Sequence, residues 1–102
     1  MNFNTLVQQA QQMQKKVNKA KKEFDAKEFE IECQNNYISG KMLGSLEIKE
    51  LHIDPTMMTS DNQDDIEALL IVTINQMISK INKEKEDTVD KLTNGVDVSA
   101  FL

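Results

Sequence analysis

The chain has 102 residues, enough for one domain and too few for two with separate cores. Its net charge is −5 and all twelve basic residues are lysine; without arginine, readout of a particular base sequence is disfavoured. The single cysteine excludes an internal disulfide, the first residues do not resemble a signal peptide, and no apolar run approaches a bilayer span. We therefore expect a protein of the reducing cytoplasm.

The charge is unevenly distributed along the chain. Residues 1–27 hold six lysines and two acids, a net charge of +4, whereas residues 28–67 hold two lysines and ten acids, a net charge of −8. Residues 68–102 are close to neutral at −1. A concentration of lysines in an acidic chain indicates either a function for those lysines or a set of carboxylates that balances them.

Residues 1–27 are predicted to form a long basic helix. We expect Asn4 or Thr5 to cap its start, and we expect its apolar stripe to end at Phe24. The stripe follows alternating intervals of three and four residues, which is typical of an amphipathic helix. Its members are Phe3, Leu6, Ala10, Met13, Val17, Ala20 and Phe24.

Three lysines of this helix recur on the face opposite the stripe. Lys15, Lys19 and Lys22 have i, i+4 and i+7 spacing, so they form a ridge that can follow a phosphate backbone. Judged on the residues alone, a solvated helix face is the more common explanation of such a charge run.

Residues 28–54 are predicted to form three antiparallel strands. In the first, Phe29, Ile31 and Cys33 alternate with glutamates, which predicts one buried face and one acidic face. This phase makes Cys33 a small core residue. Asn35 and Asn36 favour a tight turn before the second strand, which runs through Leu43.

The third strand is expected between Leu46 and Ile53, after a turn at Gly44 and Ser45. Its apolar residues change phase along the strand, which predicts either a β-bulge or a change of buried face near Lys49. His52 then lies on the face opposite its neighbours and is expected to be exposed.

Residues 55–93 are predicted to hold a short turn and a long helix. Asp54 and Pro55 favour a helical turn, and Ser60 to Gln63 has the form of a capping box. The long helix is expected from Gln63 to about Leu92, roughly 45 Å, so part of it should project beyond the body. Residues 94–102 are expected to form a tail, because Asn94 and Gly95 stop the helix.

The first half of this helix, Ile66 to Ile81, is apolar nearly all round and therefore requires burial on more than one side. The sheet also has two unpaired edges. A symmetric dimer would solve both problems. Within the protomer, we expect the first helix to pack against the second, whose acids can meet its flanking lysines.

Three segments together resemble the YbaB/EbfC family of bacterial nucleoid-associated proteins. They are LVQQAQQMQKKVNKAKKEF from Leu6 to Phe24, IDP from Ile53 to Pro55, and DDIEALLIVTINQMISKINKEK from Asp64 to Lys85. The resemblance implies one α+β domain over residues 1–102, with the order helix, three-stranded antiparallel sheet, helix. It also implies a homodimer shaped like tweezers that binds duplex DNA in the nucleoid with little sequence preference.

The resemblance makes phosphate contact the better explanation of the lysines. The expected DNA-binding residues are Lys15, Lys16, Lys19 and Lys22 on the first helix and Lys80, Lys83, Lys85 and Lys91 on the second. The expected dimer interface is formed by Ile66, Leu69, Leu70, Ile71 and Ile74.

The sequence offers no strong candidate for a metal site or a catalytic site. Asp61, Asp64, Asp65 and Glu67 are better explained as charges at a helix start than as a metal or acid–base cluster. With no catalytic constellation, we expect a non-enzyme without cofactor, metal, membrane contact or small-molecule substrate. The alternative function is a protein–protein adaptor or small holdase that does not bind nucleic acid.

Overall fold

The computed structural model describes residues 2–93, and the predicted tail lies outside them. Within that range the elements are α1 (Phe3–Asp25), β1 (Glu28–Glu30), β2 (Ile38–Leu43), β3 (Ile48–Ile53) and α2 (Gln63–Thr93). Short 3-10 turns occupy Gln34–Asn36, Pro55–Met57 and Ser60–Asn62. The strands form one antiparallel sheet in the order β1-β2-β3. The predicted α+β class and element order are confirmed.

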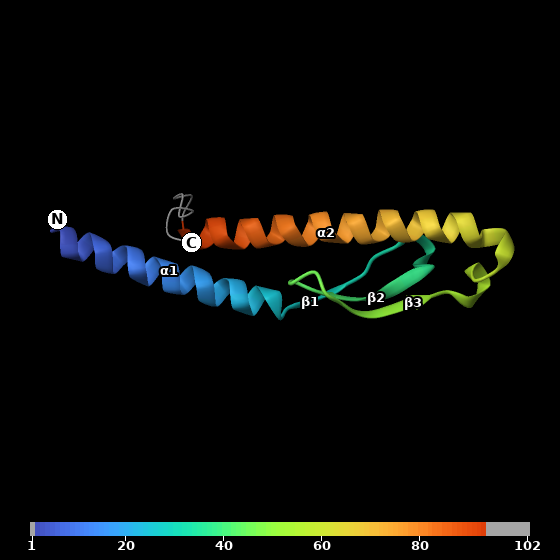
Figure 1. Ribbon diagram of the computed structural model, residues 1–102, viewed down its shortest axis with the longest axis horizontal. Coiled ribbons are helices and arrows are strands. Elements are labelled where there is room, and N and C mark those ends of the chain that lie inside the picture. Colours follow the sequence, from blue (N-terminus) through green and yellow to red (C-terminus); the bar gives the residue numbers. More distant parts are fainter. Residues whose placement is uncertain (1, 94–102) are drawn as a thin grey trace.

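The protomer is a rod of 70 × 18 × 17 Å with a radius of gyration of 19.3 Å, where a compact chain of this length would have about 13 Å. Figure 1 shows α2 lying over the sheet with its first half and beside α1 with its second half. The two helices are antiparallel, and α1 continues past the end of α2. The expected packing of α1 on α2 is confirmed, so the second half of α2 shares its arm with α1.

The helix α1 begins earlier than predicted. Its cap is Asn2, whose side-chain oxygen accepts a hydrogen bond of 2.7 Å from the backbone N–H of Asn4. The predicted caps Asn4 and Thr5 were therefore wrong, because an equally good capping residue stands two positions before them. The stripe does end at Phe24, which is buried.

The strand β1 is shorter than the alternating pattern suggested. Its ladder ends at Glu30, although the N–H of Ile31 still donates to the carbonyl of Gly40 over 2.9 Å. The burial alternates as predicted, since Phe29 and Ile31 are buried and Cys33 is half-buried. Asn35 then takes a positive φ of 58°, which asparagine tolerates in a turn.

The predicted β-bulge near Lys49 is confirmed. Lys41 pairs with Glu50 and Met42 pairs with Ile48, so Lys49 is the extra residue on β3. The strand starts at Ile48 rather than at Leu46, because Leu46 has a φ of 75° and belongs to the turn. His52 is exposed, as expected.

The connection from β3 to α2 follows the prediction at one end only. The Asp54 carboxylate accepts hydrogen bonds from the N–H and the hydroxyl of Thr56, which caps the turn that opens with Pro55. The predicted capping box at Ser60 and Gln63 was wrong. Gln63 donates its side-chain N–H to Glu67 over 3.1 Å instead of reaching back to Ser60, which lies in a 3-10 turn.

The hydrophobic core fills the space between the sheet and α2 and extends to the end of α1. Its buried members are Phe24, Phe29, Ile31, Ile38, Met42, Ile66, Met77 and Ile81. The rings of Phe24 and Phe29 meet with centroids 5.5 Å apart, which joins α1 to the sheet. The rest of α1 projects from this core as an arm.

Candidate nucleic-acid interface

Three of the predicted DNA-binding lysines share one surface of α1. Lys15, Lys19 and Lys22 are exposed and line a shallow depression of about 340 Å³ together with Asn18 and Glu23. We call these three lysines the lysine ridge. Lys16, which follows Lys15 in the same helix, is also exposed. The ridge follows the helix axis over about 10 Å, a length that covers more than one phosphate of a duplex strand.

The lysine ridge carries charge that the described part of the chain does not neutralise by direct pairing. Among residues 2–93, no carboxylate forms an ion pair within 4 Å of Lys15, Lys16, Lys19 or Lys22. Their ammonium groups therefore remain hydrated and available to an external anion. A cation that exchanges water for phosphate releases the counterions of the nucleic acid.

The predicted lysines of α2 are placed differently. Lys85 Nζ lies 3.0 Å from Asp25 Oδ1 and Lys80 Nζ lies 3.4 Å from Glu32 Oε1, so both are already paired inside the protomer. Lys83 and Lys91 are exposed, and neither is paired with a carboxylate of residues 2–93. Of these four lysines, only Lys83 and Lys91 resemble the lysine ridge, since both are exposed and neither has a carboxylate partner among residues 2–93.

A further lysine, Lys21, was absent from the predicted set. It is half-buried and lines a depression of about 270 Å³ between the helices, together with Lys85 and Glu86. In the sequence it is one of five lysines within eight residues, and its heptad position beside the apolar stripe is the signal that sets it apart.

The lysines of the sheet form ion pairs with an acidic residue of the same sheet. Lys49 Nζ donates to Glu28 Oε1, and Lys41 Nζ lies 3.8 Å from Glu28 Oε2. The hydrogen bond and charge of Lys49, with a further contribution from Lys41, hold the pKa of Glu28 below its ordinary value. The same hydrogen bond raises the pKa of Lys49. The positive charge of the sheet is thus paired, whereas the ridge has no ion-pair partner among residues 2–93.

The predicted dimer-interface residues divide into two groups. Ile66 is 8 % exposed and belongs to the protomer's own core. Ile71 is 63 % exposed, and its neighbour Val72, which the predicted set omitted, is 51 % exposed. Leu69, Leu70 and Ile74 are half-buried and pack against the same core. We call the two exposed residues, Ile71 and Val72, the α2 apolar face.

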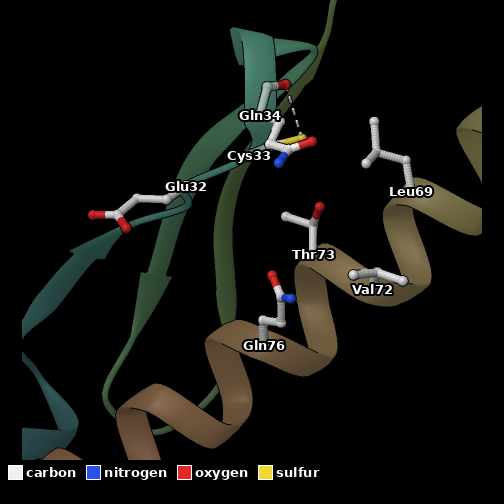
Figure 2. Close-up of a pocket in the computed structure, with 7 residues that line it drawn as sticks. All are labelled: Glu32, Cys33, Gln34, Leu69, Val72, Thr73 and Gln76. Atoms are coloured by element: carbon white, nitrogen blue, oxygen red, sulfur yellow. Dashed lines mark hydrogen bonds between the residues drawn. The ribbon is translucent and has the colours of Figure 1, made fainter.

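A hollow of about 500 Å³ adjoins this face, between α2 and the segment that follows β1. Figure 2 shows Thr73 and Gln76 pointing from α2 toward Cys33 and Gln34, with Leu69 and Val72 next to them. The thiol of Cys33 donates to the carbonyl of Gln34 over 3.5 Å. The surface beside the apolar face is therefore concave and partly polar.

The acidic residues before and within the start of α2 have a structural role. Asp64 and Asp65 lie in its first turn, where negative charge favours the helix dipole. Among residues 2–93, no group of three or more His, Cys, Asp or Glu side chains is arranged to hold a metal ion. Neither helix of this part of the chain combines the length and apolar character that crossing a bilayer requires.

Comparison with known proteins agrees with this architecture. The sequence matches the YbaB/EbfC DNA-binding family over residues 1–96. The chain belongs to this family. The resemblance inferred from the three sequence segments is thereby confirmed.

Similar proteins come from several bacteria. A nucleoid-associated protein of Psychrobacter sp. is 40 % identical over 100 residues, covering 94 % of this chain and 90 % of the relative. One from Clostridium novyi is 30 % identical over 102 residues, covering 100 % and 90 %. One from Enterococcus faecalis is 32 % identical over 95 residues, covering 93 % and 91 %.

Proposed function

We propose that this YbaB/EbfC protein is a non-catalytic, nucleoid-associated protein of the cytoplasm that binds duplex DNA as a homodimer. The observation that carries the proposal is the lysine ridge, a row of cations on a projecting arm that form no ion pair with residues 2–93. Membership of a DNA-binding family supports duplex DNA as the polyanion. Binding occurs mainly by phosphate neutralisation, because a ridge of lysines without arginine offers no planar fork for base edges.

The charge distribution of the protomer supports the arm as the attractive surface. The sheet presents Glu30 and Glu50 to solvent, which repels a phosphate backbone. The arm presents the ridge and Lys16. Lys83 and Lys91 of α2 add secondary phosphate contacts, whereas Lys80 and Lys85 contribute less because each would first have to leave its carboxylate partner.

The second copy covers the α2 apolar face in this proposal. Ile71 and Val72 lie next to each other in the chain and are both more than half exposed, so a second copy that covers them buries apolar area. An interface centred on one face of α2 is self-complementary across a two-fold axis. Such a dimer holds two arms and doubles the number of phosphate contacts.

The test is DNA binding by fluorescence anisotropy, with a labelled random duplex titrated at several salt concentrations. We compare the wild type with the triple variant Lys15→Gln, Lys19→Gln, Lys22→Gln. The log of the affinity should fall with the log of salt concentration by about 0.9 per phosphate contacted. The triple variant should bind every duplex more weakly and with a shallower salt slope.

The matched control is the triple variant Lys80→Gln, Lys85→Gln, Lys49→Gln, which removes the same charge from lysines that are paired within the protomer. It should retain most of the affinity. Equal losses in the two variants would show that only net charge matters and would contradict a site on the ridge. No binding at low salt would contradict DNA binding itself.

The α2 apolar face also favours a second candidate function, a protein–protein adaptor, because a different protein could cover Ile71 and Val72. Sedimentation equilibrium of the purified protein separates the two. A dimer that becomes a monomer on Ile71→Asp supports the homodimer. A wild-type monomer that captures a defined protein from nuclease-treated lysate, and loses it on Ile71→Asp, supports the adaptor.

A further inference from the structure

The apolar stripe of α1 is covered along one part of the helix and open along the other. Val17 is 0 % exposed and Phe24 is 5 % exposed, whereas Phe3 and Leu6 are 77 % and 47 % exposed, and Val7, which flanks the stripe, is 37 % exposed. Figure 1 shows the reason: α2 ends beside the middle of α1, and the first turns of α1 have no neighbour within residues 2–93. We call Phe3, Leu6 and Val7 the tip stripe.

The tip stripe lies in an uncharged part of the helix. No Asp, Glu, Lys or Arg occurs from Phe3 to Gln14, and the lysines begin at Lys15. A segment that covers the stripe would therefore bury no charge of α1, which removes the main desolvation cost of docking. The same lack of charge makes this part of the arm a poor contact for phosphate.

The sequence supplies a candidate segment at the place where the cover ends. After Thr93, the last described residue of α2, the chain continues through Asn94 to Leu102. The apolar members of this continuation are Val96, Val98, Ala100, Phe101 and Leu102, and Asp97 is its single charged residue. Asn94 and Gly95 stop a helix and allow the chain to change direction.

The length of the continuation matches the length of the open stripe. From Val17 to Phe3 the axis of α1 rises about 21 Å. Nine extended residues reach roughly 30 Å, so the segment can pass along the whole tip. Val98, five residues after Thr93, can reach about 16 Å, close to the rise of about 16 Å from Val17 to Leu6.

We propose that residues 96–102 bind the tip stripe of α1 in the same chain and complete the cover that α2 leaves unfinished. Attachment at Thr93 gives the segment an effective concentration in the millimolar range at the stripe, which a second copy reaches only in concentrated solution. The contact closes the apolar surface at the end of the arm and limits association between arms. It does not depend on DNA binding.

The first test is a disulfide cross-link in a full-length chain carrying Cys33→Ser. One variant combines Leu6→Cys with Val98→Cys, and its control combines Gln8→Cys with Val98→Cys, because Gln8 lies on the opposite side of α1. Under mild oxidation, the first pair should form an internal bridge several-fold more than the control. Non-reducing gels separate an internal bridge, at monomer mass, from a bridge between chains, at dimer mass.

Three results overturn the proposal: no bridge, equal yields for the two pairs, or bridges between chains only. The last result would assign the stripe to a second copy.

The second test is hydrogen exchange on the full chain. Replacing Val98 and Phe101 by aspartate should speed exchange of the amides of residues 5–12 several-fold, because an undocked tip frays more often. Exchange in the core segment of α2 around Met77 should stay unchanged, which shows that the variant is folded. Unchanged exchange at residues 5–12 overturns the proposal.

Discussion

Lys85 Nζ of α2 lies 3.0 Å from Asp25 Oδ1 at the end of α1, although the two residues are 60 positions apart in the chain. Both side chains are partly exposed, at 33 % and 45 %. The pair stands close to a second bridge, Lys27 to Glu84 at 3.1 Å. Together the two ion pairs fasten the junction of α1 with α2. The lysine belongs to α2 in the first pair and to the segment just after α1 in the second.

This pairing predicts that Lys85 contributes to stability more than to DNA binding. Lys85→Gln should lower the free energy of unfolding by no more than about 0.5 kcal/mol, since partly exposed pairs are screened by solvent. It should change DNA affinity less than Lys19→Gln does. Urea denaturation and anisotropy on the two variants check this, and a larger affinity loss for Lys85→Gln would refute it.

Gly44 should not tolerate a side chain. A Cβ at this position would overlap the carbonyl oxygen of Phe24 and approach its ring, and the N–H of Gly44 donates to the carbonyl of Lys27 over 2.9 Å. Gly44→Ala should therefore cost about 1 to 3 kcal/mol of stability as an overpacked site. Ser45→Ala, at the exposed next position, is the control and should be near neutral. Equal unfolding midpoints would contradict the predicted overlap.

Substitutions at Ile81 and Ile71 should have different effects, the first on the stability of the fold and the second on the proposed homodimer. Ile81 is 0 % exposed and Ile71 is 63 % exposed on the same helix. Ile81→Ala should lower the free energy of unfolding by about 2 to 5 kcal/mol. Ile71→Ala should leave the fold intact and weaken the proposed homodimer, as measured by sedimentation equilibrium over a range of concentrations. A dimer that is stable to Ile71→Ala and to Ile71→Asp would move the interface elsewhere.

Asp54 should give the protein a specific sensitivity to acid. The backbone N–H of Thr56, followed by its hydroxyl, lowers the pKa of Asp54 from its ordinary value of 3.8. Because the folded pKa is the lower one, the cap contributes fully above about pH 3.8 and its contribution is lost as the pH falls through the folded pKa. Asp54→Ala should therefore be less stable than the wild type at pH 7.

The gap between Asp54→Ala and wild type should narrow as the pH drops below 3.8. Urea midpoints from pH 7 to pH 2.5 measure it. A gap that stays constant with pH would show that the cap acts without its charge.

Two local features of this fold, the β-bulge and the turn before α2, could be predicted from the sequence. The change of phase between Ile48 and Leu51 predicted the bulge at Lys49, and the Asp54–Pro55 pair predicted the turn before α2. Each depends on residues a few positions apart, where the period of a strand or the φ of proline fixes the outcome.

The details that were not predicted are hydrogen bonds and ion pairs for which the sequence offers more than one possible partner. Asn2, Asn4 and Thr5 are all good caps, and the sequence does not rank them. Gln63 can reach back toward Ser60 or forward to Glu67, and the structure has the second contact. Likewise, pairing of Lys80 with Glu32 requires two segments 48 positions apart to meet, which no local pattern shows.

The thin shape of the protomer has a practical consequence for its hydrodynamics. A rod of 70 × 18 × 17 Å experiences more friction than a sphere of equal mass and elutes early from a sizing column. An 11.7 kDa monomer would then imitate a larger globular protein in elution volume. Its tumbling is anisotropic as well, with slow end-over-end rotation. A mass obtained without assuming a shape, from light scattering or sedimentation equilibrium, is what distinguishes one copy from two.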